Sequence, residues 1–146
     1  ITEREGHTYR VPFYEQGGFK PGLDATIYPP KPDLKIKNDT GSWLLFQATY
    51  DAKKTKLTFE IFGASDGRTT KIEGPFITST APPPPPIYED DPNLQNGIIK
   101  QIDTAHWGAN TYFKREVVRG NSVLISEIVS TNYIPWPARF LRGTKL

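Results

Sequence analysis

The 146-residue chain contains no cysteine and no methionine. Without cysteine it can form no disulfide, no cysteine-ligated zinc site and no thiol nucleophile of its own. Because translation starts with methionine, and Ile1 is an unusual residue to follow a removed one, we expect a cut fragment, a processed mature chain or the ordered part of something larger. The absence of cysteine is compatible with either side of a membrane.

An excess of one charge is also missing, since 18 Lys and Arg residues stand against 16 Asp and Glu residues, for a net charge of +2. The basic residues are not clustered as in proteins that bind the phosphate backbone, so no nucleic-acid partner is expected. No apolar run approaches the roughly 18 residues of a membrane span. The two histidines, His7 and His106, have no metal-ligand spacing with other residues, and neither a metal nor another cofactor is expected.

Alternating polar and apolar residues dominate what is present, and no segment longer than ten residues shows helical periodicity. The runs 43–50 and 57–63 alternate on either side of a short polar loop, which predicts a β-hairpin. Short strands are also predicted at 25–28 and 33–38. The run 10–14 is expected to be extended, because a proline restricts the residue before it to non-helical conformations.

Proline is abundant, with 14 residues, five of them consecutive at 82–86. Such a run forms a polyproline II rod, which acts as a stiff linker or as a ligand for an aromatic groove, and we favour the linker. Further strands are predicted at 98–102, 112–118, 123–129 and 138–141, with a tight turn at Gly120. The sequence therefore predicts an all-β fold in which two small antiparallel modules, 1–79 and 96–146, are joined by a proline-rich linker, 80–95.

Four sequence blocks in the first half resemble a known family. They are EREGHTYRVP at 3–12, PGLDATI at 21–27, DLKIKNDT at 33–40 and LTFEIFG at 57–63. In this order they resemble the C-terminal half of a VanW-like domain, which typically reads E-R-x-x-H-S, then P-G-x-D-A-T, then D-L-x-F-x-N-x-T. The glycine-rich block with a cysteine and a helix that opens such domains is not in this sequence.

The second half, 96–146, resembles a degenerate G-five domain. The resemblance depends on YFKR at 112–115, on the turn at Gly120 and on the closing RGTK at 142–145. G-five domains are small extracellular β-modules, often found beside VanW-like domains and associated with cell-wall polysaccharide binding and surface adhesion. Together the two resemblances imply an extracellular or cell-surface location on a bacterium.

The first functional hypothesis is a non-enzymatic module of the bacterial cell envelope. It would bind wall polysaccharide or peptidoglycan, or assemble into a surface structure such as a filament. Trp107 lies in an expected loop and Trp136 between two prolines, so both are candidates for an exposed binding surface. Tyr9 and Arg10 are the other candidate binding residues. Trp43 is expected to pack in the core of the first module.

The alternative hypothesis is part of a cell-wall amide- or peptide-processing enzyme. In the complete VanW-like domain the order Cys, His, Asp resembles the catalytic arrangement of papain-like and transglutaminase-like enzymes. The resemblance implies His7 and Asp24 as catalytic residues, with Tyr9 or Arg10 lining the same cleft, and the cysteine outside this chain. We therefore expect His7 and Asp24 to lie close together and expect no catalysis from this chain alone. His7 as a structural hydrogen-bonding residue, and Asp24 as a turn cap, is the other interpretation.

The expected partners follow from the missing helical layer. Without it, one sheet would leave Leu44, Phe46, Leu57, Phe59 and Ile61 partly uncovered. Exposed sheet faces and edges favour pairing with other chains. We therefore expect the chain to pack against copies of itself or against an upstream fragment of the same domain.

Overall fold

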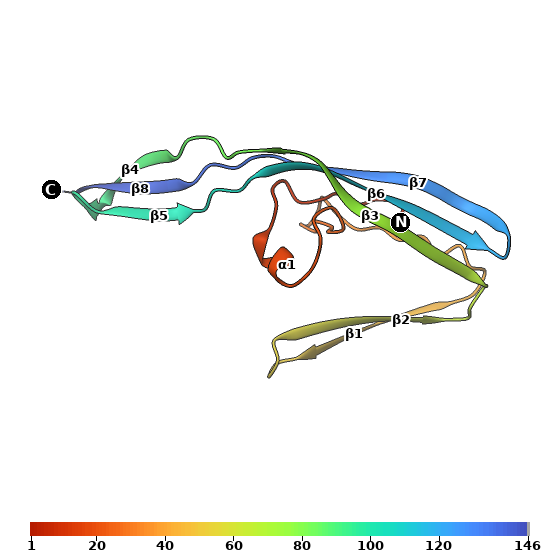
Figure 1. The fold of residues 1–146 in the computed structure, drawn as a ribbon. Coiled ribbons are helices and arrows are strands. Elements are labelled where there is room, and N and C mark those ends of the chain that lie inside the picture. The colour runs from red at the N-terminus through yellow and green to blue at the C-terminus, as the bar shows by residue number, and fades with distance from the viewer. Residues whose placement is uncertain (146) are drawn as a thin grey trace.

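The computed structural model describes residues 1–145, and its regular structure is almost entirely β-strand, arranged in three separate sheets (Figure 1). The expected all-β fold is confirmed. No helix among the described residues is long and apolar enough to cross a membrane. The elements are α1 (Pro12–Gln16), β1 (Leu44–Asp51), β2 (Lys56–Gly63), β3 (Arg68–Ala81), β4 (Ile87–Gln95), β5 (Ile99–Asp103), β6 (Gly108–Arg119), β7 (Ser122–Tyr133) and β8 (Arg139–Lys145).

Strands β1 and β2 form the expected hairpin, in which Leu44 is opposite Gly63 and Asp51 is opposite Lys56. The hairpin extends away from the long sheet that contains β3 (Figure 1). Because no layer packs on it within residues 1–145, it buries neither face, and Phe59 is 70% exposed. The expectation that Trp43 is a core residue is wrong for the same reason, since its side chain is 71% exposed.

The second sheet has the order β3-β6-β7 and is antiparallel throughout. Strand β6 is central, and its alternate residues Ala109, Phe113 and Val117 are buried on one face. The turn into β7 is made by Gly120, whose φ of 56° favours glycine. The strands predicted at 112–118 and 123–129 are therefore present and longer than the sequence pattern indicates.

The third sheet has the order β4-β8-β5, with β8 parallel to β4 and antiparallel to β5. A glycine in β8 allows the backbones to approach closely at this crossing. The backbone N–H of Gly143 donates to the carbonyl of Ile98 at 2.8 Å, and a Cβ on Gly143 would lie 1.9 Å from the carbonyl oxygen of Gln95. Only glycine fits there without a backbone shift.

Strand pairing corrects the expectation for the segment 80–95. Its first residues end β3, where Thr80 is opposite Ala109 of β6, so the expected boundary at 79/80 falls inside a ladder. The acidic run at 89–91 lies in β4 and not in a linker. Its partners are more than forty residues away, and this pairing leaves no local signal in the sequence. Whether the two halves of the chain fold independently stays a prediction.

The N-terminal segment also differs from the sequence prediction. The residues after Val11 form the short helix α1 and are not extended, because Pro12 occupies its first turn, where proline is well accommodated. Val11 itself is extended, as expected for a residue before proline. The ranges 25–28 and 33–38 are not strands, and only an isolated bridge joins Glu3 to Lys35.

This segment packs against the β3-β6-β7 sheet, so residues near the N-terminus contact residues from the second half of the sequence (Figure 1). The backbone N–H of Ile134 donates to the carbonyl of Thr8 at 2.7 Å. A Cβ on Gly22 would lie 2.7 Å from the Oγ1 of buried Thr111, so the loop approaches the sheet closely. The sheet therefore acts as the platform on which the N-terminal residues are positioned.

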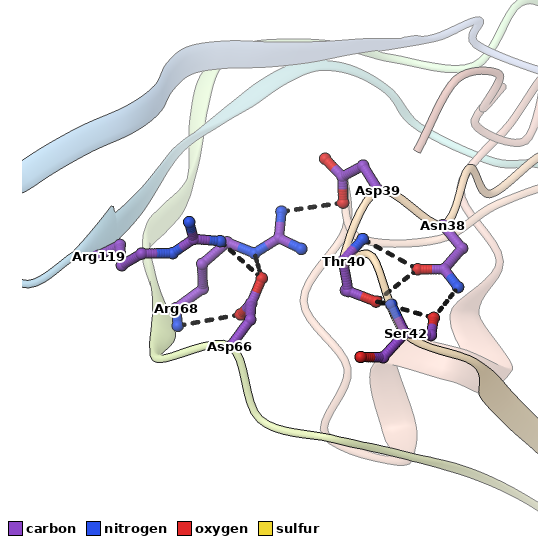
Figure 2. A network of polar contacts seen from close by, with 7 residues as sticks. All are labelled: Asn38, Asp39, Thr40, Ser42, Asp66, Arg68 and Arg119. Atoms are coloured by element: carbon purple, nitrogen blue, oxygen red, sulfur yellow. Dashed lines mark hydrogen bonds and ion pairs between the residues drawn. The ribbon is translucent and has the colours of Figure 1, made fainter.

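A network of ion pairs links the turn at 38–42 to the edge of the same sheet (Figure 2). The guanidinium of Arg68 lies 2.6 Å from Asp66 and 2.9 Å from Asp39, and Arg119 of β6 lies 2.8 Å from Asp66. At Asp66 desolvation opposes ionisation, but the hydrogen bonds from the Arg68 backbone and the Arg119 side chain outweigh it and lower the pKa. At Asp39 the hydrogen bond from Arg68 is the main cause of the lowered pKa. The network ties the loops on both sides of the hairpin to the sheet.

Candidate functional site

His7 and Asp24 are in direct contact, which confirms the expected proximity. The imidazole Nδ1 of His7 lies 2.6 Å from Oδ2 of Asp24, and the backbone N–H of His7 donates to the same oxygen at 2.9 Å. Both side chains are partly buried, at 27% and 16% exposure. The carboxylate thus holds both the backbone and the ring of the histidine, and the catalytic role of the pair stays a prediction.

A third residue, Tyr133, completes this cluster and was missed from the sequence. Its hydroxyl donates to the other carboxylate oxygen, Oδ1 of Asp24, and accepts the backbone N–H of Gly22 at 2.6 Å. Tyr133 ends β7, is 109 residues from Asp24 and is only 3% exposed. The site is therefore assembled from both halves of the chain, and no local motif could have shown it.

These contacts fix the charges of the cluster. Burial opposes ionisation of Asp24, but the hydrogen bonds from Tyr133 and from the backbone and ring of His7 outweigh it and lower the pKa of Asp24 to about 2. Burial, and then the contact with Asp24, raises the pKa of Tyr133. At neutral pH the carboxylate is ionised and the phenol is a neutral donor. An imidazole that donates from Nδ1 to this carboxylate leaves Nε2 able to accept a proton, as in histidine-based general-base catalysis.

A cavity of about 300 Å³ adjoins the cluster. His7, Asp24 and Tyr133 form part of its wall, and the rest comes from α1 and the loop after it: Val11, Tyr14, Glu15, Phe19, Lys20, Pro21, Leu23 and Ala25. Tyr9 and Arg10, which were expected to line the same cleft, are not among these wall residues. The guanidinium of Arg10 is instead held by Glu15, with Nε–Oε1 and Nη2–Oε2 distances of 2.8 and 2.5 Å.

Tyr9 and Trp136, two of the residues proposed to bind a ligand, lie together in an aromatic cluster. The ring of Tyr9 stacks on His106, with centroids 4.6 Å apart and planes at 20°, and lies 5.3 Å from Trp136. The indole N–H of Trp136 donates to Asp103 at 2.7 Å, and this contact is the main cause of the lowered pKa of Asp103. Trp107 follows in the sequence and is 53% exposed. The cluster of Tyr9, His106 and Trp136 joins the N-terminal segment to the entry of β6 and the exit of β7.

No group of three or more His, Asp or Glu side chains suitable for a metal ion occurs within residues 1–145.

The N-terminal segment is similar to a known protein family. Residues 1–62 match the family model for VanW like protein. The match supports a VanW-like domain there and includes His7 and Asp24, whereas Tyr133 and Trp136 lie outside it. No curated protein matches the chain. The resemblance of the second half to a G-five domain stays a prediction.

Proposed function

We propose that the chain is a non-enzymatic module of the bacterial cell envelope that binds wall polymer, either polysaccharide or peptidoglycan, outside the cell. The VanW-like match supports an association with the envelope. The binding itself is supported by the aromatic cluster of Tyr9, His106 and Trp136 beside exposed Trp107.

The cluster has the chemistry of a sugar-binding surface. Aromatic rings offer a large apolar face with a polar edge, which suits the apolar faces and hydroxyl groups of a pyranose ring. The contact with Asp103 orients the indole of Trp136, and the stacked Tyr9 and His106 rings form a nearly parallel pair. A preformed aromatic surface binds with less loss of side-chain freedom than a disordered one.

Co-sedimentation with purified peptidoglycan sacculi tests this function. We expect Trp107→Ala to weaken binding about fivefold, which corresponds to the loss of one exposed aromatic contact. Trp43→Ala is the matched control, because Trp43 is also exposed but lies outside the cluster. Equal binding by both variants and the unchanged chain would contradict the proposal.

A second candidate function is supported by a different observation, the contact of His7 Nδ1 with Asp24. In this candidate the chain is the C-terminal part of a wall amide- or peptide-processing enzyme, and His7 activates a cysteine that another segment supplies. The test is hydrolysis of muropeptides by a form of the protein that carries a cysteine-containing upstream segment. His7→Gln should lower kcat at least about 100-fold. Retention of full activity by His7→Gln would exclude the mechanism.

We also propose that copies of the chain associate, or that an upstream segment of the domain covers the hairpin. The support is the exposed apolar surface of β2, where Phe59 and Ile61 share one face and are 70% and 59% exposed. Light scattering should show association for the chain alone, and the double substitution Phe59→Lys, Ile61→Lys should give a monomer. A monomeric unchanged chain without added residues would contradict self-association.

A further inference from the structure

The cavity beside His7 has walls suited to a small ligand with an apolar body. Its volume of about 300 Å³ is at the lower end of the roughly 300–1,000 Å³ typical of ligand sites. Besides Tyr133, six of its wall residues are apolar or aromatic, and they all come from the segment 11–25. They are Val11, Tyr14, Phe19, Pro21, Leu23 and Ala25.

The charged wall residues differ in whether other groups of the protein bind them. Glu15 is bound by both nitrogens of the Arg10 guanidinium that face it. Asp24 accepts hydrogen bonds at both oxygens, as described above. Lys20 makes no ion pair within residues 1–145. Ionised Asp24 also borders the cavity, but both of its oxygens are occupied by hydrogen bonds, so Lys20 is the charged wall residue that is left to pair with an anionic group of a ligand.

The cavity also offers one polar acceptor. His7 forms part of the wall, and its Nδ1 is engaged by Asp24. With Nδ1 donating, Nε2 can accept a hydrogen bond from an amide N–H. A matching ligand therefore has a carboxylate, a small alkyl group and a neighbouring amide.

We propose that this cavity binds the C-terminal residue of a short peptide with a small alkyl side chain. Lys20 pairs with the terminal carboxylate, the apolar walls take the alkyl group, and His7 faces the last peptide amide. This inference depends on the second candidate function above and names its substrate class. An amine-terminated or strongly cationic ligand would meet the charge of Lys20 and is disfavoured.

Titration of the ¹⁵N-labelled chain with N-acetyl-alanyl-alanine, followed by NMR, tests the site. We expect shift changes at 7–25, and about tenfold weaker binding when the peptide carboxylate is converted to an amide. Lys20→Gln should cause a similar loss. Lys53→Gln is the matched control, because Lys53 is also an exposed lysine but lies at the tip of the β1-β2 hairpin. Both variants change exposed side chains and should keep the fold.

Equal binding by Lys20→Gln and Lys53→Gln would overturn the proposal, as would shift changes confined to residues outside the cavity. Butyrate that binds as tightly as the peptide would also overturn it, because the amide would then contribute nothing. The assay needs no catalysis, so the two proposals fail separately. Lys20-dependent binding without hydrolysis by the longer form overturns the enzymatic function alone. If His7-dependent hydrolysis is equally fast for substrates with a free and with an amidated C-terminal carboxylate, the peptide site alone is overturned.

Discussion

Replacing Asp24 with asparagine should remove a defined part of the pH-dependent stability. The carboxyl has its pKa lowered from 3.8 to about 2 in the folded chain, which corresponds to about 2 to 3 kcal/mol of stabilisation when it is ionised. Because the folded-state pKa is depressed, this contribution is present above about pH 4 and is lost as the pH falls toward 2. The difference in unfolding free energy between the unchanged chain and Asp24→Asn should therefore be about 2 kcal/mol larger at pH 6 than near pH 2.

Urea denaturation followed by tryptophan fluorescence over this pH range measures the difference. The matched control is Glu116→Gln, which removes an exposed carboxylate of β6 that makes no ion pair within residues 1–145. The unfolding free energy of this control should depend on pH in the same way as that of the unchanged chain. The reasoning is refuted if Asp24→Asn has the same pH dependence as the unchanged chain, because the contacts of Asp24 with His7 and Tyr133 would then contribute nothing to folding.

Three further predictions concern the sheets and their connections. Gly143→Ala should destabilise the chain by about 2 kcal/mol or more in thermal unfolding, because the new Cβ meets the backbone of Gln95, and an unchanged melting temperature would contradict this. Trp136→Phe removes the donor to Asp103, so the pKa of that carboxyl should rise when followed by carboxyl ¹³C NMR; an unchanged pKa would contradict the assigned cause. Asp66→Asn should lower the melting temperature more at low than at high ionic strength, because the network of Figure 2 is partly exposed, at Asp39 and Arg119, and is therefore screened by salt.

The fold could be predicted where the signal is local. The hairpin of β1 and β2 and the antiparallel pair β6 and β7 follow from period-two alternation and short turns. Strand β4 could not be predicted in this way, because its sequence contains Asp90, Asp91 and Pro92 and its pairing partner is the distant β8. The proline at position 12 was interpreted only through its effect on Val11, although it also begins a helix.

The candidate site was predictable in part for the same reason. His7 and Asp24 lie within family blocks that are close in the sequence, and their contact follows from that resemblance. Tyr133 lies at the end of an ordinary strand, and only the packing of the N-terminal segment on β7 brings its hydroxyl to Asp24. Tyr9 was expected in the cleft beside His7 and Trp136 on an exposed surface, whereas the structure brings the two together around His106.

The position of β8 between β4 and β5 sets the order in which the third sheet can form. Neither β4 nor β5 pairs with the other, and both ladders use Arg139–Lys145. During synthesis from the N-terminus, both earlier strands therefore remain without their partner until these residues emerge. The sheet is therefore completed late in synthesis. Until β8 pairs with them, the edges of β4 and β5 are open to a strand from any neighbouring chain.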